Sequence, residues 1–415
     1  MAEGLNPNQH SKPADTDDAG RLKRVAKPDR AQAMVRFDAI RTEVHRDFST
    51  CEGVWRALDR QTPCSIHHTY GWCHAWIEAH GGEPRIVIGY QGSEPLFLLP
   101  LEMQRLAGRR VARLIGSAHS NLAFGPHAAS FSHLPDAATR VALVASFREA
   151  LPDCHALLLE KMPAQWLGTD NPWLAFPTIE NQNNAFQITL HADFEDVLAQ
   201  VNRKRRRKKF RNAEKALNEM GGYEVTVAET TEDARSLLDL FFAQKARRLA
   251  EQGLADPFAK PAVRAFLHRI AAESLHSDVK MLQLWALRLR GAEGSEIAAI
   301  VGLSAIEGRF TAQFGSIDET AAPNVSVGEL LYHHIIERCC GPEAIVFDFG
   351  IGDQAYKRSW CDIERVHYDA HIPLTPVGKL LCTALRQATA TKRAIKRRPA
   401  LEKIARRIAA PFRRA

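Results

Sequence analysis

The sequence has 415 residues, of which 45% are apolar and 25% are charged, the balance of a soluble globular protein. This length exceeds what one hydrophobic core usually organises, so two domains are expected. The longest nearly apolar run, Ile297–Ile306, reaches only half of the ~20 residues that a transmembrane helix needs. The first residues mix both charges and lack the apolar segment of a secretory signal. We therefore expect a cytoplasmic protein without a transmembrane helix.

Cysteine spacing and charge distribution narrow the possibilities further. Eight cysteines are scattered without a repeated Cys-x-x-Cys motif, which argues against a zinc ribbon or a disulfide framework and favours reduced thiols. The net charge of +7 is unevenly distributed. The segment 203–211 carries eight basic residues in nine, and 379–414 carries twelve against one acid, so the rest of the chain has a net charge of −12. Basic character therefore belongs to two local segments.

The first half of the chain predicts a lobe of strands and helices. Residues 1–33 are polar and interrupted by prolines, which is typical of a disordered leader. Apolar periodicity then predicts helices at 54–58 and 70–80, strands at 85–90, 95–103 and 111–116, a helix at 137–151 and a strand at 156–160. Polar residues and prolines near residue 185 end this pattern. We therefore expect an N-terminal lobe over residues 34–187.

The second half repeats this order of elements. A long helix is predicted from Phe194 to Met220, with Gly221-Gly222 as its C-terminal stop. The patterns that follow predict a strand at 223–228, helices at 232–252 and 262–275, strands at 280–290, 297–306 and 310–317, a helix at 327–339, a strand at 345–349, a short helix at 354–360 and a strand at 366–372. The shared order predicts a structural duplication. We expect a C-terminal lobe over residues 188–375 and a basic amphipathic tail over residues 376–415.

The segment 310–360 has the most informative pattern. A strand leads through the loop Asp318–Asn324 into a helix that opens Ser326-Val327-Gly328-Glu329. A helix N-terminus that follows a strand binds anions, because its free N–H groups and its dipole point to one spot. A pyrophosphate fits this chemistry. The alternative is a capping box, since Ser326 and Glu329 have the S-x-x-E spacing.

Several short motifs occur in a characteristic order between about residue 35 and residue 375. They are Trp72 and Trp76, Leu98-Leu99-Pro100-Leu101, Leu114-Ile115-Gly116, the basic run 203–211, Ser326-Val327-Gly328-Glu329-Leu330-Leu331, Phe347-Asp348-Phe349-Gly350, and Tyr356-Lys357 with Trp360. This arrangement resembles the GNAT acyltransferases, in particular the CelD-type branch associated with bacterial polysaccharide and cellulose biosynthesis. The resemblance implies an α/β (α+β) fold of tandem GNAT-like domains, each a mixed, mostly antiparallel sheet flanked by helices. It extends to the Fem-type aminoacyl transferases.

The resemblance also implies where a donor substrate binds. In GNAT enzymes the strand before the signature helix contacts the pantetheine arm of acyl-CoA, and the helix N-terminus takes the pyrophosphate. By position, the arm would contact Phe314, Gly315 and Ser316, and the phosphates would contact Ser326, Val327 and Gly328. The usual loop signature carries more glycine positions than this loop, which has the single Gly328. Fewer glycines leave fewer places where the backbone can approach a phosphate closely.

Acyl transfer needs a base for the nucleophile, donors for the oxyanion and an acid for the thiolate. Tyr356 has the position of the tyrosine that GNAT enzymes often keep near the sulfur, so it is the candidate acid; its alternative is packing on the sheet. Lys357 is the candidate for holding an anionic substrate or an oxyanion, by likeness to a Fem-type lysine; its alternative is a solvated surface residue. Asp318 and Asp353 are candidate proton acceptors, with turn or cap roles as alternatives.

The two basic segments have several interpretations. The run 203–211 neutralises phosphates in principle, but only Phe210 offers an aromatic face, so nucleic-acid binding is disfavoured against a solvated helix face or an anionic substrate. The tail 379–415 places Leu401, Ile404, Ile408 and Phe412 at helical spacing among basic residues. Such a helix binds the surface of an anionic membrane, here the inner face, or packs on its own domain.

No metal is expected. The pairs His67-His68, His333-His334 and Cys339-Cys340 are adjacent in sequence, and adjacent side chains point in different directions, so they do not converge on one ion. The leading function is therefore transfer of an acetyl or longer acyl group from acyl-CoA to an amine or hydroxyl of a sugar, polysaccharide or envelope precursor. The alternatives are Fem-like aminoacyl transfer from tRNA and a non-catalytic adaptor that binds membrane or nucleic acid.

Overall fold

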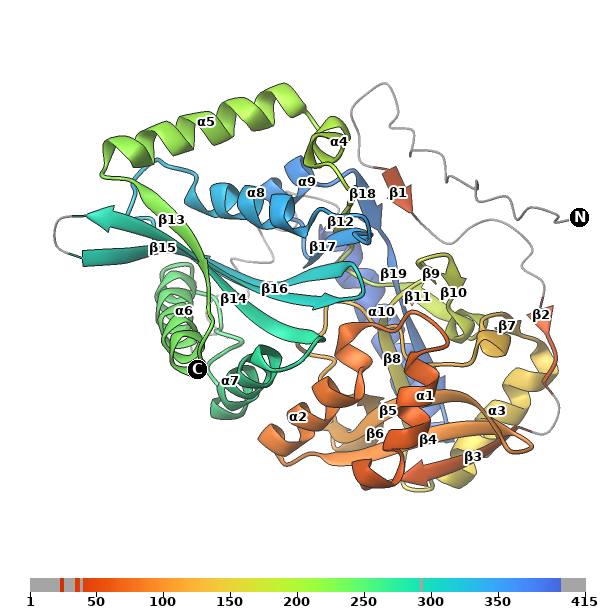
Figure 1. The fold of residues 1–415 in the computed structure, drawn as a ribbon. Coiled ribbons are helices and arrows are strands. Elements are labelled where there is room, and N and C mark those ends of the chain that lie inside the picture. The colour runs from red at the N-terminus through yellow and green to blue at the C-terminus, as the bar shows by residue number, and fades with distance from the viewer. Residues whose placement is uncertain (1–22, 26–33, 38–39, 292–293, 397–415) are drawn as a thin grey trace, which may run out of the picture.

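The computed structural model describes residues 23–25, 34–37, 40–291 and 294–396, which form two large β-sheets with helices packed on both (Figure 1). The first sheet has the strand order β11-β19-β8-β6-β5-β4-β3, and the second has the order β1-β18-β12-β17-β16-β15-β14-β13. Both sheets are mixed, because β6 pairs with β8 and β16 with β17 in parallel among antiparallel neighbours. This confirms the α/β (α+β) fold class.

The first lobe follows the predicted order of elements closely. It contains β3 (Ile40–His45), α1 (Glu52–Asp59), α2 (Tyr70–His80), β4 (Glu83–Gln91), β5 (Glu94–Leu106), β6 (Arg109–Leu114), α3 (Ala137–Ala150) and β8 (Ala156–Pro163). Local signals explain several boundaries. Gly81 ends α2 with φ of 61°, and the Asp136 side chain begins α3 by accepting a hydrogen bond from the N–H of Thr139. The predicted hairpin is the β4–β5 pair.

The second lobe repeats that order. It contains β13 (Tyr223–Val227), α6 (Thr231–Glu251), α7 (Pro261–Leu275), β14 (Lys280–Gly291), β15 (Gly294–Ile306), β16 (Arg309–Ile317), α8 (Val327–Cys339) and β17 (Val346–Ile351). Strand neighbours also correspond, since β3-β4-β5-β6-β8 in one sheet matches β13-β14-β15-β16-β17 in the other. The predicted structural duplication is therefore present.

The lobes exchange the strand that completes each sheet. β12 (Ala185–Thr189), which directly follows the first lobe in sequence, pairs antiparallel with β17 of the second lobe. β19 (His367–Pro373), which follows the second lobe, pairs antiparallel with β8 of the first. The expectation that the last strand belongs to the C-terminal lobe is therefore wrong for these residues. Each sheet depends on a strand from the other half of the sequence.

Shorter elements extend both sheets and fill the connections. They are β1 (Lys23–Val25), β2 (Met34–Val35), η1 (Phe48–Thr50), η2 (Ile66–His68), η3 (Ala129–Phe131), β7 (Leu134–Pro135), β9 (Gln165–Trp166), β10 (Thr169–Asp170), η4 (Pro172–Ala175), β11 (Thr178–Glu180), α9 (Ala355–Trp360) and β18 (Ile363–Arg365). β1 pairs in parallel with β18. Residues 23–25 of the expected disordered leader are thus a strand, and the remainder of that leader lies outside the described residues.

A shared core joins the lobes. Buried side chains of α1 and α2 belong to the same apolar cluster as buried side chains of α6, α7 and β14. The rings of Trp72 and Trp76, on α2, each lie 5.1 Å from the ring of Phe266, on α7. Aromatic contacts of this kind add to the burial of apolar area. The lobes therefore pack as one body through α2 and α7.

Two helices differ from their predicted form. The single helix expected at 194–220 is divided into α4 (Phe194–Ala199) and α5 (Arg203–Glu219), because Asn202 caps the N-terminus of α5 with its side chain. The expected tail begins as α10 (Pro376–Lys396), which packs on the first lobe through the buried Cys382, beside Val111 and Leu158. Residues 376–396 are therefore part of the folded protein. The apolar stripe at 401–412 lies outside the described residues.

Candidate functional site

The parallel strands β16 and β17 diverge after a short paired segment. Their register has three pairs, Arg309 with Val346, Phe310 with Phe347 and Thr311 with Asp348. Beyond Thr311, β16 continues along β15 as far as Ile317. β17 stays paired with β12 on its other side. Two strands that separate within a sheet leave backbone edges without a ladder partner, so a bound ligand can pair with them.

Gly315 and two tyrosines meet at this divergence. A Cβ on Gly315 would lie 3.6 Å from the hydroxyl of Tyr332, on α8. The Tyr332 ring stacks on the ring of Tyr356, on α9, with centroids 5.6 Å apart. Burial raises the pKa of the Tyr356 hydroxyl, and the pKa of Tyr332 is raised further. Both hydroxyls are therefore protonated at neutral pH and can donate a hydrogen bond or a proton.

Lys357 is buried, in contrast to the alternative of a solvated surface lysine. Its Nζ donates to the carbonyl oxygens of Ile351 at 2.8 Å and Gly350 at 3.2 Å, at the end of β17. Burial lowers the pKa of Lys357 to about 8, against the opposing attraction of Asp348. Asp348 is itself buried, and it accepts hydrogen bonds from Gln187 at 2.8 Å and from the N–H of Gly350 at 2.6 Å. Lys357 can thus donate to an anion and, near its pKa, accept a proton.

The sequence prediction missed two side chains of α6 that contact the same strand. Lys245 Nζ donates to the carbonyl oxygen of Gly315 at 3.2 Å, and burial lowers the pKa of this lysine. The hydroxyl of Ser316 donates to Oε1 of Gln244 at 2.6 Å. The only sequence signal for these side chains was that Gln244 and Lys245 are two successive polar residues in an amphipathic helix. The structure brings Lys245 close enough to Lys357 for its charge to lower the pKa of Lys357 as well.

The two predicted aspartates are not brought together with Tyr356 and Lys357. Asp318 accepts from Arg247 at 2.8 Å, and hydrogen bonding from Thr320, joined by Arg247, lowers the pKa of Asp318 to about 2. Asp353 is exposed and pairs with Arg358 at 2.6 Å. Each aspartate therefore has an arginine partner and lies in a loop, in line with the turn alternative.

The side chain of Phe314 packs in the hydrophobic core. Its ring stacks on Phe241, with centroids 4.1 Å apart, and lies where a Cβ of Gly302 would otherwise be. This side chain belongs to the core that joins the lobes. The side chain of Phe314 is therefore not available to a ligand along β16.

The N-terminus of α8 lacks the predicted capping box. The Ser326 side chain makes no capping hydrogen bond, although Ser326 is the N-cap residue. The carboxylate of Glu329 instead accepts from Arg206 at 2.7 Å and from Lys209, both on α5. Val327 donates its N–H to the carbonyl of Val325 at 2.9 Å. The N–H groups of Gly328 and Glu329 belong to the first turn, so they have no hydrogen-bond acceptor within the helix.

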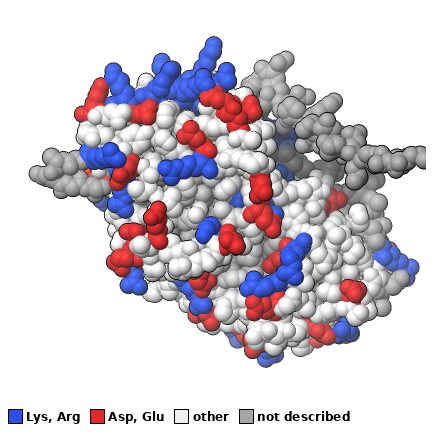
Figure 2. Space-filling model, viewed as in Figure 1, with Lys and Arg blue, Asp and Glu red and all other residues white. Residues whose placement is uncertain are grey.

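The basic helix α5 has one bound face and one exposed face. On the bound face the Arg206 guanidinium lies 4.3 Å above the ring of Trp360 and donates to the carbonyl of Ser359 at 3.0 Å. Phe210 stacks on His333 with centroids 3.9 Å apart. The exposed face gathers the other cations along one ridge (Figure 2), namely Arg203, Lys204, Arg205, Arg207, Lys208 and Arg211.

Other residues considered as ligands do not converge. Within the described part of the chain, no group of three His, Cys, Asp or Glu side chains is placed to hold a metal ion. All eight cysteines are free thiols. No helix among the described residues is both long and apolar enough to span a membrane.

Comparisons with known proteins agree with this topology. The family model described as an acetyltransferase (GNAT) domain matches residues 204–358. No curated protein matches the chain. The crystal structure of FemX superposes with a TM-score of 0.55 and 12% identity, covering 82% of this chain and 99% of FemX. At this identity the likeness concerns the fold alone.

Two further solved structures have lower scores. A tandem GNAT protein from the clavulanic acid biosynthesis pathway has a TM-score of 0.46 and 12% identity, covering 81% of this chain and 99% of that protein. The C-terminal domain of a protein described as a lysylphosphatidylglycerol synthetase, from Agrobacterium fabrum, has a TM-score of 0.48 and 12% identity, covering 83% and 96%. The strand order and the duplication describe a tandem GNAT-like fold, and residues 204–358 are the part of it that matches the acetyltransferase (GNAT) domain model.

Proposed function

We propose that the second lobe transfers an acetyl or longer acyl group from acyl-CoA to an amine or hydroxyl of a small acceptor. The acceptor class is a sugar, polysaccharide or envelope precursor, as the resemblance to the CelD-type branch implies. The observation that carries the proposal is the divergence of β16 and β17, with Gly315, Tyr356 and Lys357 gathered beside it. Of the predicted catalytic residues, Tyr356 and Lys357 have the placement that this function needs.

The N-terminus of α8 suits the phosphates of the donor. Its first-turn amides are free of a side-chain cap. The two nearby acids do not oppose an anion, because Glu329 is paired with Arg206 and Lys209, and Asp318 with Arg247. From this end the pantetheine arm would run back along β16 past Ser316, Gly315 and Phe314. The Gly315 carbonyl already accepts from Lys245, and its second lone pair is left for an amide of the arm.

The reaction follows from these placements. The acceptor nitrogen or oxygen attacks the thioester carbon and forms a tetrahedral oxyanion, for which Lys357 supplies a positive charge. The carbon–sulfur bond then breaks, and the Tyr356 hydroxyl gives its proton to the departing thiolate. The proton that the acceptor loses passes to solvent, and the Tyr356 phenolate regains a proton from solvent, so that Lys357 stays charged beside the oxyanion. A direct base role for Asp318 or Asp353 would first require release from its arginine partner.

Aminoacyl transfer from tRNA, as in Fem-type enzymes, is the second candidate. The observation in its favour is the exposed ridge of cations on α5, which offers a phosphate backbone a row of positive charges (Figure 2). Calorimetry with acetyl-CoA separates the two donors, because only the acyl-CoA proposal requires micromolar or tighter binding of CoA. RNA binding that weakens steeply with salt, without CoA binding, would support the second candidate and overturn the first.

The location of the protein is also a proposal. A cytoplasmic protein attached to the inner face of an anionic membrane would use the segment 397–415, since α10 itself is packed on the first lobe. The basic residues of that segment would contribute on the order of 1 kcal/mol each near an anionic leaflet. Sedimentation with anionic vesicles tests this attachment.

A further inference from the structure

A loop of the first lobe reaches into the divergence of β16 and β17. The side-chain amide of Asn121 donates to the carbonyl oxygen of Ala312 and to Oε1 of Gln313, each at 3.3 Å. Ala312 is the first residue of β16 beyond its paired segment with β17. Asn121 therefore contacts the second lobe where its two strands begin to separate.

The same side chain also contacts β17. Gly350 has φ of 72°, and a Cβ at this position would lie 2.8 Å from Cγ of Asn121. Any larger residue at 350 would collide with the amide and would also be strained in the left-handed region. The carbonyl of Gly350 accepts from Lys357. Asn121 thus bridges β16 and β17. It contacts Gly350, whose carbonyl accepts the hydrogen bond from Lys357.

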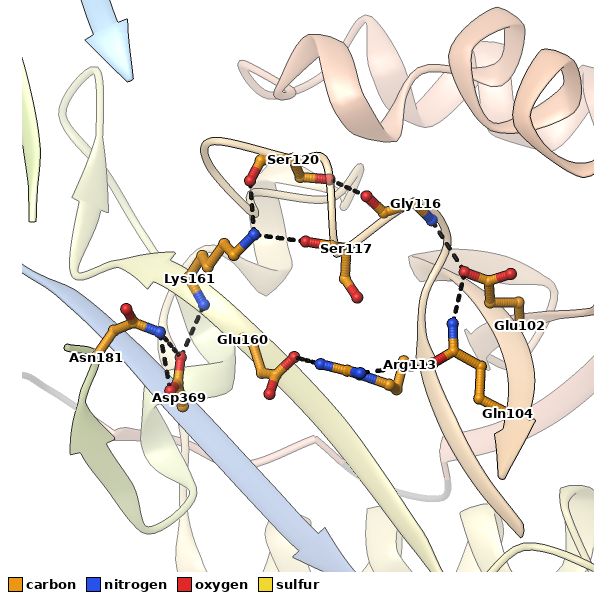
Figure 3. A network of polar contacts seen from close by, with 10 residues as sticks. All are labelled: Glu102, Gln104, Arg113, Gly116, Ser117, Ser120, Glu160, Lys161, Asn181 and Asp369. Atoms are coloured by element: carbon orange, nitrogen blue, oxygen red, sulfur yellow. Dashed lines mark hydrogen bonds and ion pairs between the residues drawn. The ribbon is translucent and has the colours of Figure 1, made fainter. Parts of the chain in front are cut away.

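Buried hydrogen bonds hold the loop that carries Asn121 (Figure 3). Lys161 Nζ donates to the carbonyls of Ser117 at 2.5 Å and Ser120 at 2.8 Å. The N–H of Gly116 donates to Glu102 at 3.1 Å, and the Ser120 hydroxyl donates to the Gly116 carbonyl at 3.0 Å. Both ends of the segment 116–120 are thereby fixed to the first sheet. The position of Asn121 is set by this network as well as by its own contacts.

A buried histidine secures Asn121 from the other side. The N–H of Asn121 lies 3.4 Å from Nε2 of His67, which is 3.0 Å from Oε1 of Gln313. Burial lowers the pKa of His67 to about 4, so the ring is neutral at pH 7 and its Nε2 can accept or donate one hydrogen bond. His67 therefore holds either the backbone of Asn121 or the Gln313 side chain that Asn121 contacts.

We infer that Asn121 forms the inner end of the acyl pocket of the second lobe and restricts the donor to short acyl groups. The inference rests on the proposed function. If the phosphates lie at α8 and the arm runs back along β16, the acyl group is the part of the donor nearest Ala312. Further carbons would meet the Asn121 amide. A polar wall also disfavours an alkyl chain, because the chain would cover the hydrogen-bonding amide.

A water-sized space lies beside Leu122, the residue that follows Asn121. A small pocket between the lobes is lined by Leu122, His67, Ser304, Thr311 and Asp348, at the paired ends of β16 and β17. Shortening residue 121 would itself free the volume of the carboxamide for further acyl carbons. The lobe that lacks the GNAT family match therefore determines which donor the other lobe accepts.

The test compares CoA, acetyl-CoA, butyryl-CoA and hexanoyl-CoA binding by calorimetry, which needs no knowledge of the acceptor. In the unaltered protein we expect hexanoyl-CoA to bind at least tenfold more weakly than acetyl-CoA. Asn121→Ala should remove that difference while leaving the affinity for CoA within about threefold. Asn121→Gln, which keeps an amide that can donate to Ala312 and Gln313 and does not shorten the side chain, is the control and should keep the discrimination. Asn121→Ser is a milder truncation for use if the alanine variant melts at a lower temperature.

The outcomes separate this inference from the proposed function. Tight CoA binding with the same chain-length ratio in the unaltered protein and in a folded Asn121→Ala variant would overturn the inference alone. Equal affinity for acetyl-CoA and hexanoyl-CoA in the unaltered protein would also overturn the inference alone. Failure of the unaltered protein to bind any CoA compound would overturn the proposed function and the inference with it.

Discussion

Arg206 of α5 and Glu329 of α8 form a partly buried ion pair, with Nη1 and Oε2 2.7 Å apart and only 6% of the arginine side chain exposed. The guanidinium also covers Trp360. This contact adds to the buried Ala213 and Leu217 in packing a strongly basic helix on the protein. It also neutralises the acid nearest the N-terminus of α8, so that the helix end is open to an anion.

The first prediction concerns this pair. Glu329→Ala leaves the Arg206 charge buried without its carboxylate, so we expect unfolding free energy to fall by about 2–4 kcal/mol, less than for a fully buried pair. Chemical denaturation measures it. Glu195→Ala, which removes an exposed partner of Arg207, is the control and should cost under about 1 kcal/mol. Equal effects of the two substitutions would mean that the Arg206–Glu329 pair contributes no more than a surface contact.

The second prediction concerns the pH dependence that Lys357 produces. Its folded-state pKa of about 8 is below the ordinary value of 10.5, so the unfolded chain binds more protons between these values. Stability from this group therefore rises as the pH increases from 8 towards 10.5. Compared with Lys357→Met, the unaltered protein should gain about 2 kcal/mol between pH 7.5 and pH 9.5. Denaturation at both pH values measures it.

The control for this measurement is Lys215→Met, which changes an exposed lysine of α5. Its difference from the unaltered protein should be the same at both pH values. A difference between the unaltered protein and Lys357→Met that does not change with pH would show that Lys357 is solvated and not buried.

The third prediction is catalytic. Tyr356→Phe removes only a hydroxyl, so an acid role predicts a fall in turnover of roughly 10²-fold with CoA affinity nearly unchanged. Turnover is measured as release of the free thiol of CoA. Tyr223→Phe, which removes a hydroxyl that contacts His334, is the matched control and should keep full turnover. Normal turnover in Tyr356→Phe would leave Tyr356 with a packing role against Tyr332.

The fourth prediction separates the two parts of the C-terminal segment. A chain that ends at Lys396 should melt within a few degrees of the full chain. A chain that ends at Pro376 exposes the apolar surface under Cys382 and should be strongly destabilised. Only the full chain should sediment with anionic vesicles. Vesicle binding by the chain that ends at Lys396 would place the membrane contact elsewhere.

Apolar periodicity was sufficient to predict most helices and strands. It could not predict which distant strands pair with each other. The strands of the β14–β15–β16 meander and the helix α8 agree with their predicted ranges within a few residues, because apolar spacing and turn residues are local signals. The exchange of β12 and β19 has no local signal. β19 was predicted as an ordinary strand and β12 was not predicted at all, and only the hydrogen-bond partners in the folded protein reveal which sheet each completes.

The candidate site was predictable where a motif carried it. Tyr356 lies near Gly315 through Tyr332, and the roles given to Tyr356 and Lys357 stay predictions. The capping-box alternative for Ser326 and Glu329 is wrong. Spacing alone cannot show that a glutamate has a stronger partner on another helix. Asn121 had no signal, since its contacts join residues separated by nearly two hundred positions.

The most direct test of the central claim is calorimetry of acetyl-CoA binding with Gly328→Glu. A Cβ at Gly328 would lie 2.9 Å from Cγ2 of Ile317, so this branched side chain must shift, and the added carboxylate would face the phosphates at the start of α8. Gly341→Glu places the same charge just beyond the end of α8, where no atom lies within 4 Å of the new Cβ, and serves as the control. Gly328→Ala shows the effect of the Cβ alone. We predict micromolar or tighter binding in the unaltered protein and in Gly341→Glu, and at least 10²-fold weaker binding in a folded Gly328→Glu variant. Equal affinity in the unaltered protein, Gly341→Glu and Gly328→Glu would contradict a phosphate site at this helix, and so would the absence of binding in the unaltered protein.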